Sequence, residues 1–513
     1  MKRSLLPHIG IGLGLAIVYL TASYFLKENG YYHLEAYFIQ YKIDQLFRFD
    51  ISFYRTFYFT EPALLFLGSL LLSWIPVFQS TFMLNALVIG GLITFIYHKS
   101  KEKQSNSWWL LIYLLLSPVV WFAATSGGSF ALYLTFYFFF FWLILGYIRE
   151  YSVFHLASLS ILLGVFLLLD RSLLKLLILL IPIFFFISFY KAKGIRGNFY
   201  SKASVIFSND SQRRKFFTGF FSSILLVAFI PLTGFGIYHL INKVFGGGVF
   251  YYQTSLADFW NSYSGKSLLE LSDSLDWTFI SEGNLFFLFL TICVGTALLN
   301  LFLWKGKSTS LPILAFLALG YVISEVADNK ILNLNLQLLG MLSGAGLAGL
   351  VYRPVKNLTV PRKILRTLIL VLIIALELVY FHFSVFSHEA RFIQTIFQTE
   401  QSSEELKSIQ NVQNFFNGKH GARILADDAI FFPQLSNLPE SALWVGHFSP
   451  DFQHGLQEPD LYADYLIITP ENHPLHLNDI VAAALDRLAY HGITLRTKVV
   501  YSDDLTIILE LLD

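Results

Sequence analysis

Charge is scarce in this 513-residue chain, because only 14% of its residues are Asp, Glu, Lys or Arg. A typical soluble domain carries about 25% charged residues, so this composition excludes a soluble enzyme and a disordered chain. Cysteine is also nearly absent. The single Cys293 excludes an intrachain disulfide and a metal cluster built from cysteines.

Apolar and aromatic residues take the place of charge. Hydrophobic residues make up 55% of the chain and aromatic residues 17%, with 52 Phe and 27 Tyr. They are grouped in blocks of about 20 residues, the length that a helix needs to cross ~30 Å of hydrocarbon. The sequence therefore predicts an α-helical multi-pass membrane protein. The first block lacks a small-residue cleavage site, so we expect it to remain as a membrane helix.

The hydrophobic blocks predict about eleven membrane-spanning helices. They are expected at 5–26, 81–97, 108–124, 130–148, 153–169, 172–190, 216–241, 284–304, 309–327, 331–350 and 364–386. A twelfth apolar run at 62–78 is about 17 residues long, which is borderline for a span. Pro76 interrupts this run.

The distribution of Lys and Arg decides whether residues 62–78 cross, because basic residues gather in cytoplasmic loops. With Met1 inside and 62–78 lying at the interface, the inside segments hold 20 basic residues against three acids. If 62–78 crossed, every later basic loop would face the wrong side. The sequence thus predicts a cytoplasmic N-terminus, eleven crossings and juxtamembrane helices that do not cross.

The charge balance also divides the chain in two. Residues 1–386 hold 29 basic and 17 acidic residues, whereas residues 387–513 hold seven basic and 18 acidic ones. We expect a transmembrane body at 1–386 in the cell (inner) membrane. Residues 387–513 should form a soluble, extracytoplasmic α/β domain, since an odd number of crossings places it outside.

The C-terminal part shows the alternation of an α/β domain. Helices are predicted from Ser402 to about Asn417, opened by a capping box, and from Asn478 to Tyr490. Strands are predicted at 422–426, 442–446, 464–469, 494–501 and 505–511.

The first outward loop, 27–80, concentrates groups that could do chemistry. It contains the acids Glu35, Asp44, Asp50 and Glu61 and the bases Lys42, Arg48 and Arg55. Carboxylates at a membrane surface act as general bases or bind a divalent cation, and Arg or Lys suits a phosphate group. Ordinary ion pairs on an amphipathic surface helix would leave the same pattern.

Other candidates are more isolated. Arg171, beside Asp170 in a tight outward turn, suits a lipid-linked phosphate or a simple interfacial anchor. In the second outward loop, 243–283, Asp258 and Tyr252 are candidates for an acceptor site, and a lid without catalytic groups is the alternative. Glu377 lies within the last span, where we expect a hydrogen-bonded packing residue rather than a proton path.

Two further motifs have weak alternatives. The triplet Gly246-Gly247-Gly248 lacks the Lys-Ser/Thr of a phosphate loop, so a turn is expected. His473 and His476 are a possible metal pair, but Pro474 between them favours a loop.

The order of these features resembles the GT-C superfamily of integral-membrane glycosyltransferases, which take sugars from polyprenyl-phosphate carriers. The acidic motif after the family's first helix is matched by Leu34-Glu35-Ala36-Tyr37, and its Glu-Pro segment by Glu61-Pro62. Gly164 through Asp170-Arg171 matches a further span. Ser117-Pro118 is also present, but Ser126-Gly127-Gly128-Ser129 stands where many members carry a second acid.

The resemblance implies a sugar transfer at the outer face of the membrane, with inversion at the anomeric centre. It implies a general base at Glu35 or Asp44, a donor phosphate held by Arg171 and Arg55, and a divalent cation (Mg²⁺ or Mn²⁺) on Glu35 and Asp50. The partners would be a lipid-linked sugar donor and a glycan, lipid or protein acceptor. Two alternatives remain open: a non-catalytic GT-C-like subunit of a larger assembly, and a polysaccharide polymerase or ligase.

Overall fold

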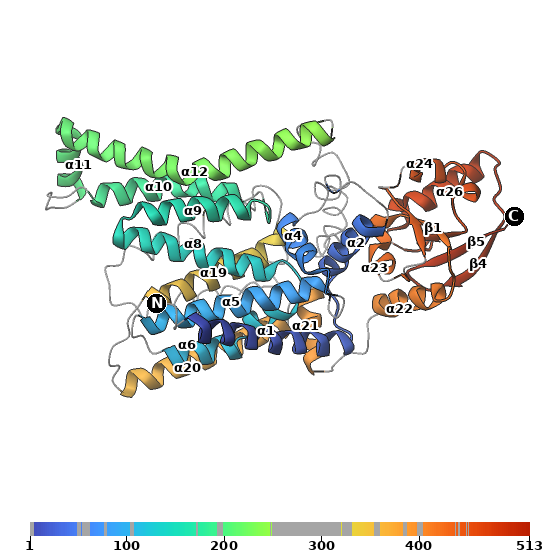
Figure 1. Ribbon diagram of the computed structural model, residues 1–513, viewed down its shortest axis with the longest axis horizontal. Coiled ribbons are helices and arrows are strands. Elements are labelled where there is room, and N and C mark those ends of the chain that lie inside the picture. The colour runs from blue at the N-terminus through green and yellow to red at the C-terminus, as the bar shows by residue number, and fades with distance from the viewer. Residues whose placement is uncertain are drawn as a thin grey trace.

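A helical body and a smaller α/β domain make up the chain (Figure 1). The computed structural model describes residues 5–48, 53, 62–75, 79–102, 107–170, 173–191, 199–246, 248, 320, 331–352, 360–382, 387–397, 404–436, 438–439, 442–447, 449, 451–473 and 475–512. The predicted spans at 284–304 and 309–327 lie outside these residues.

The helical body is built from long apolar helices and shorter connecting ones. They are α1 (Leu5–Glu28), α2 (Leu34–Arg48), α4 (Ala63–Leu72), α5 (Ser80–Glu102), α6 (Ser107–Leu116), α7 (Pro118–Thr125), α8 (Phe130–Glu150), α9 (Val153–Phe166), α10 (Leu174–Lys191), α11 (Phe199–Ser208), α12 (Asp210–Gly246), α19 (Ile331–Tyr352), α20 (Val360–His382) and α21 (Ser387–Phe397).

Four helices in the described part of the chain are long and apolar enough to cross a membrane. They comprise Ile9–Glu28, Ser80–Glu102, Phe130–Glu150 and Asp210–Phe245. Helices α9, α10, α19 and α20 contain shorter apolar segments. This architecture is compatible with the predicted membrane protein.

Helix α4 corresponds to the borderline run at 62–78. It has ten residues, from Ala63 to Leu72, and is therefore about 15 Å long. That is half of the hydrocarbon thickness, so α4 alone is too short to cross. This length supports the prediction of a juxtamembrane helix.

The predicted span at 108–124 is wrong as a single helix. It is divided into α6 and α7 at Ser117, whose backbone is extended (φ −68°, ψ 119°). The break arises because the ring of Pro118 disfavours a helical conformation at the preceding residue. The Ser117 hydroxyl oxygen then accepts a hydrogen bond from the Val120 N–H and caps α7.

Successive long helices alternate in direction, so the basic segments gather at one end of the body (Figure 1). We call this the basic end. The ends of α5 and α8 and the start of α12 lie there (Figure 1), and these helix termini carry Lys99, Lys101, Arg149 and Arg213. The C-terminal domain lies beyond the opposite end, which we call the domain end and which carries α2 (Figure 1). The separation follows the charge pattern that the sequence analysis assigned to the inside loops.

Glycines allow two helix pairs in the body to approach closely. A Cβ atom at Gly344 of α19 would lie 2.6 Å from the Phe138 backbone nitrogen of α8. A Cβ atom at Gly90 of α5 would lie 2.7 Å from the Gly12 carbonyl oxygen of α1. Small residues of this kind are the usual contacts between membrane helices.

The C-terminal domain contains a five-stranded sheet in the order β2-β1-β3-β5-β4. Strands β1 (Arg423–Ala426), β2 (Leu443–Val445) and β3 (Tyr465–Ile468) are parallel, and β4 (Thr497–Ser502) and β5 (Ile507–Leu511) complete the sheet in antiparallel pairing. Its helical elements are α22 (Glu404–Phe416), α23 (Asp428–Leu435), α24 (Phe452–Gly455), α25 (Pro459–Tyr462), the 3₁₀ turn η3 (His476–Asn478) and α26 (Ile480–Tyr490). All five predicted strands and both predicted helices of this domain are present.

Helix α21 belongs with the helical body, although it falls within the predicted soluble domain. Its Phe392 ring is buried against Phe381 of α20 and against Tyr31, which follows α1. Helix α21 packs there because it has one strongly apolar face on an otherwise polar helix, and such a helix binds at an interface. The sheet domain itself begins with α22.

Candidate functional site

Glu35 occupies the first turn of α2, at the domain end of the body. The backbone N–H of Ser129 donates a 2.7 Å hydrogen bond to its Oε2 atom. The residue keeps some exposed surface, but protein encloses its carboxyl group. This burial raises the pKa of Glu35 to about 7, against the opposing effect of the Ser129 hydrogen bonds. A carboxyl group with this pKa is suited to general acid–base catalysis at neutral pH.

The segment Ser126–Ser129 joins α7 to α8 and lies directly against Glu35. Gly127 has a positive φ of 77°, a backbone conformation that favours glycine. The Asn85 side-chain amide of α5 donates a 2.8 Å hydrogen bond to the Gly128 carbonyl oxygen. A Cβ atom at Gly128 would lie 2.6 Å from the His33 ring and 3.0 Å from Glu35 Oε2. Glycine is thus required for this close approach.

Asp170 approaches the same place from the end of α9. It accepts a 3.1 Å hydrogen bond from the Tyr133 hydroxyl, and Tyr133 is one helical turn beyond Ser129 on α8. Glu35 is near enough to Tyr133 to interact with it electrostatically. We call Glu35, Gly128, Ser129, Tyr133 and Asp170 the Glu35 cluster. It brings together three segments that are far apart in the sequence.

Helix α21 covers the residues that precede Glu35. The His388 ring stacks on His33, with ring centroids 4.3 Å apart and planes 22° apart. Burial lowers the pKa of His33 to about 3, with a further contribution from the positive charge of Arg391. Burial, together with repulsion from His33 when that ring is protonated and from Arg391, also holds the pKa of His388 well below its usual value. The imidazole pair is therefore neutral at physiological pH.

Asp44 does not join Glu35. It lies nine residues further along α2, and nine residues turn a helix by about 900°, so the two side chains project from opposite faces. Asp44 accepts a 2.9 Å hydrogen bond from the Gln40 amide on its own face. The other predicted site residues, Asp50, Arg55, Arg171, Tyr252 and Asp258, lie outside the described residues.

Glu377 of α20 packs between helices, as the sequence analysis expected. Its Oε1 atom accepts a 2.8 Å hydrogen bond from the Tyr113 hydroxyl of α6. Its Oε2 atom accepts a 2.6 Å bond from the Ser117 hydroxyl at the α6–α7 break. The side chain is fully buried, and these bonds satisfy both oxygens of a costly polar group.

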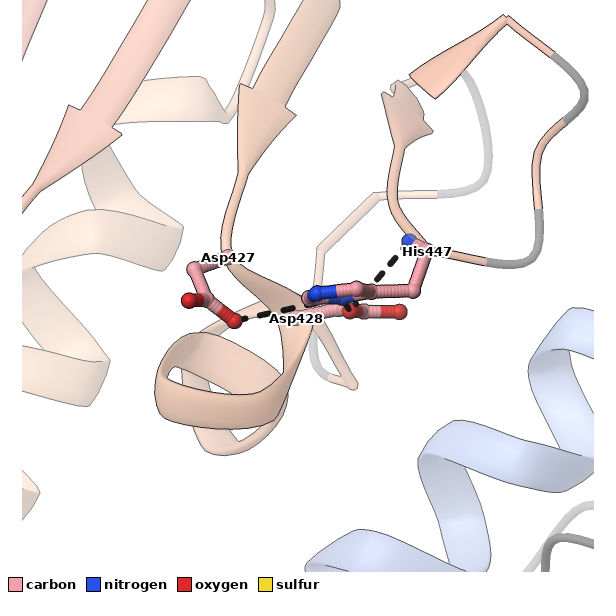
Figure 2. A group of neighbouring side chains, drawn as sticks. All are labelled: Asp427, Asp428 and His447. Carbon is pink, nitrogen blue, oxygen red and sulfur yellow. Dashed lines mark hydrogen bonds and ion pairs between the residues drawn. The ribbon is translucent and has the colours of Figure 1, made fainter. Parts of the chain in front are cut away.

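A second group of titratable residues lies in the C-terminal domain (Figure 2). Asp427 and Asp428 follow β1, His447 follows β2, and the three side chains face one another. Their candidate ligand atoms lie within 4.8 Å of one another, which is close enough to hold a metal ion. The ends of adjacent parallel strands meet at one sheet edge, which is where α/β domains commonly bind ligands.

Protein donors already occupy the oxygens of this group. Asp427 Oδ1 accepts the Ala429 N–H at 3.1 Å and caps α23, and its Oδ2 accepts the Ile480 N–H at 2.9 Å. Asp428 Oδ1 bonds His447 Nδ1, and its Oδ2 accepts the Tyr41 hydroxyl of α2 at 2.5 Å. The residues therefore fit an ion-paired contact better than a metal centre.

Asp428 and His447 each stabilise the charged form of the other. Burial alone would raise the pKa of Asp428, but the neighbouring His447 outweighs it and the pKa falls to about 2. Burial lowers the pKa of His447, yet the carboxylate of Asp428 more than offsets this and raises it above the usual value. Burial raises the pKa of Asp427 to about 7. Below its raised pKa, His447 is protonated and forms a buried ion pair with Asp428.

Helix α2 provides the other side of this contact. Tyr41 bonds Asp428, the Gln45 amide is 2.5 Å from the Tyr41 hydroxyl, and the Phe38 ring packs edge-on against Phe432 of α23. Lys42, which is 3% exposed, lies 5.4 Å from the Phe38 ring centroid. We call the packing of α2 against Asp428, His447 and α23 the α2 interlock. It connects the helix that carries Glu35 to the soluble domain.

Asp427, Asp428 and His447 were not among the site residues predicted from the sequence. Their position was the available signal. The two acids directly follow one buried strand and the histidine follows the next, and the ends of adjacent parallel strands meet at one edge of the sheet. The predicted alternative of a loop at His473 and His476 agrees with the structure, in which His476 begins η3 and its Nδ1 lies 2.8 Å from the Thr469 carbonyl oxygen.

Comparisons of the chain with protein-family models and with curated proteins give no match.

Proposed function

We propose that this chain is a GT-C-type membrane glycosyltransferase that moves a sugar from a polyprenyl-phosphate carrier to an acceptor at the outer face of the membrane. The observation that supports it is the Glu35 cluster. Glu35 and Asp170 were matched to two motifs of that superfamily, the Ser126–Ser129 segment stands where many members carry a second acid, and these three segments meet at the domain end.

In this proposal Glu35 is the general base. Its carboxylate removes the proton from the acceptor hydroxyl as the hydroxyl oxygen attacks the anomeric carbon of the donor. The bond between that carbon and the phosphate oxygen breaks, and the polyprenyl phosphate leaves with the electron pair. A single displacement inverts the anomeric centre and leaves the proton on Glu35. A pKa of about 7 lets the group accept this proton and return it to water.

The remaining roles are assigned by position in the sequence. Arg171 follows Asp170 directly, so in the proposal it binds the donor phosphate together with Arg55. Tyr252 and Asp258 of the second loop contribute to the acceptor site. The partners are a lipid-linked sugar donor and a glycan, lipid or protein acceptor at the cell (inner) membrane, with the C-terminal domain outside.

No step of the proposed reaction passes through a metal ion. The resemblance implies Mg²⁺ or Mn²⁺ on Glu35 and Asp50, and Asp50 lies outside the described residues. The Asp427–Asp428–His447 group has its oxygens satisfied by protein donors. The proposed mechanism assigns the base to Glu35 and the stabilisation of the charge on the leaving group to Arg171.

The test is a transfer assay with purified full-length protein and polyprenyl-phosphate sugars. Glu35→Gln keeps the size of the side chain and removes the base, so transfer should fall by roughly 10²–10⁴-fold while donor binding remains. Glu28→Gln is the matched control, since Glu28 is an exposed acid at the same end of the body. Asp44→Asn distinguishes the two predicted bases. Loss of transfer in Asp44→Asn together with full activity in Glu35→Gln would reject this assignment.

A non-catalytic GT-C-like subunit is the second candidate. It is favoured by the Ser126–Ser129 segment, which offers Glu35 a backbone N–H where many superfamily members carry a second acid. Absence of saturable donor binding by the wild-type protein, with and without divalent metal, would favour this candidate. Stable copurification with other membrane proteins would support it further.

A further inference from the structure

A cavity of about 450 Å³ lies between α8, α9, α10 and α12, near the basic end of the helical body. Its size is that of a small-molecule site. It is distant from the Glu35 cluster, because its lining comes from the end of α8 and the beginning of α12 (Figure 1). The proposed sugar transfer at the domain end makes no use of it.

The charge of the cavity favours an anionic ligand. Lys215 is the one cation among its described lining residues, which include no carboxylate. Lys215 is exposed and forms no ion pair with another described residue. The nearest acid on α12, Asp210, is engaged 2.5 Å from Arg213. The Gln212 amide, one turn before Lys215 on the same helix face, adds a hydrogen-bond donor.

The lining changes from polar to apolar along α12. Gln212, Lys215, Gly219, Ser222 and Leu226 all line the cavity and recur every three or four residues, so they form one stripe on the helix. Ser222 lies about 10 Å beyond Lys215 along the helix axis and Leu226 about 16 Å beyond it. The stripe is charged at Lys215, polar at Ser222 and apolar at Leu226. This order matches a membrane lipid, whose charged headgroup is followed by polar ester groups and then by acyl chains.

Gly219 and Tyr151 shape the cavity beside this stripe. A Cβ atom at Gly219 would meet no atom within 4 Å, so there is free space beside the middle of the stripe. Tyr151 ends α8 in a left-handed conformation with φ 50°, which is unusual for a tyrosine. This conformation places a tyrosine at the cavity, where it forms an edge-to-face contact with Tyr147.

We propose that this cavity binds one anionic phospholipid of the leaflet at the basic end. Its phosphate interacts with Lys215 and Gln212, and one acyl chain lies along the α12 stripe from Gly219 to Leu226. A free phosphate ion shares only the first of these contacts. The apolar continuation of the stripe is the reason to assign the site to a lipid.

Native mass spectrometry of the delipidated full-length protein tests this proposal with three probes: phosphatidylglycerol, phosphatidylcholine and inorganic phosphate. Phosphatidylglycerol should bind most tightly, and inorganic phosphate should neither bind nor displace it. Lys215→Gln should weaken phosphatidylglycerol binding on the order of tenfold, as expected for the loss of a hydrogen bond to a charged group. Phosphatidylcholine carries the same phosphate beside a cationic choline, so its weaker binding should fall by a smaller factor.

Gly219→Phe places a ring in the free space and should abolish lipid retention. Gly234→Phe is its matched control, because Gly234 lies on the same helix, has equally open surroundings and is not part of the cavity lining. Tyr151→Gly removes the aromatic ring at a position where the backbone already suits glycine, so it tests the site even if Gly219→Phe does not fold. Equal binding of the two lipids, retention in Gly219→Phe, or displacement by inorganic phosphate would each overturn the proposal.

Discussion

Contacts from two segments, the α7–α8 connection and α21, surround Glu35 and the residues before it. The Ser129 N–H at the start of α8 binds its carboxylate, Gly128 leaves room for it, and His388 of α21 closes the space behind His33. Glu35 could be chosen from the sequence because an acid after the first apolar block is a visible signal. Gly128 and Ser129 could not, since a backbone N–H is present at every position and nothing local indicates a partner 94 residues away.

Gly128→Ala should reduce sugar transfer by about tenfold or more, because small displacements of a catalytic group cost this much. The new methyl group would collide with the His33 ring and Glu35 Oε2, which forces the carboxyl group to move. Gly91→Ala is the control, since a Cβ atom at Gly91 of α5 meets no atom within 4 Å. The measurement is kcat/KM for both variants; equal values would show that Glu35 does not depend on this contact.

The pH dependence of stability offers a separate check on Glu35. Its pKa is about 7 in the folded protein and near 4.5 when exposed, so between these values the folded state binds more protons than the unfolded state. Stability should therefore fall as the pH rises from about 4.5 to about 7. Glu35→Gln should remove this part of the pH dependence and should not lower stability at pH values near 8. Thermal unfolding of both proteins across this range measures it, and parallel curves would contradict the raised pKa.

At the scale of elements, local sequence patterns were sufficient to predict the strands of the C-terminal sheet. They were not sufficient to predict how the sheet domain packs against the helical body. Strands such as 464–469 could be predicted from their short β-branched and apolar runs, and the structure contains β3 there. The docking of α2 on α23 could not be predicted in this way. Tyr41 and Asp428 are 387 residues apart, and their contact depends on how the two domains pack rather than on either local sequence.

The Asp428–His447 ion pair should make the α2 interlock sensitive to pH. His447 has a raised pKa, so its stabilising contribution is present below its ordinary value of 6.5 and is lost as the pH rises through the folded value. Asp428 has a lowered pKa, so its contribution is lost only as the pH falls from 3.8 to about 2. The pair should therefore be strongest at mildly acidic pH. Lys42 and Asp427 titrate in the same contact and must be separated from this effect.

A double-mutant cycle of Asp428→Asn and His447→Gln makes that separation, because effects of Lys42 and Asp427 largely cancel in the coupling energy. Hydrogen exchange of α2 in the full-length protein gives the opening free energy of each variant. The coupling should be about 1–3 kcal/mol near pH 6 and should decline toward alkaline pH. A coupling that stays constant with pH would mean that His447 is neutral and binds Asp428 only by a hydrogen bond.

At the scale of the whole molecule, the distribution of charge carries most of the predictive information. Among the described residues, the basic ends of α5 and α8 and the basic start of α12 lie at one end of the body (Figure 1). The sequence could not reveal which helix packs against the α6–α7 break, where the Ser117 hydroxyl binds Glu377 from a helix 260 residues later. Helix order is thus predictable from hydropathy and charge, whereas pairing between distant helices is not.

The orientation of the whole molecule can be tested with two single cysteines in a chain whose native Cys293 is replaced by serine. Leu477→Cys lies in the C-terminal domain and Tyr200→Cys on α11 at the basic end; the native side chains are 93% and 84% exposed. An impermeant maleimide should label Leu477→Cys in intact cells, or in spheroplasts where an outer barrier intervenes. It should label Tyr200→Cys only after lysis, because basic loops remain in the cytoplasm. Labelling in the opposite order would place Glu35 at the cytoplasmic face and remove the basis for an extracytoplasmic sugar transfer.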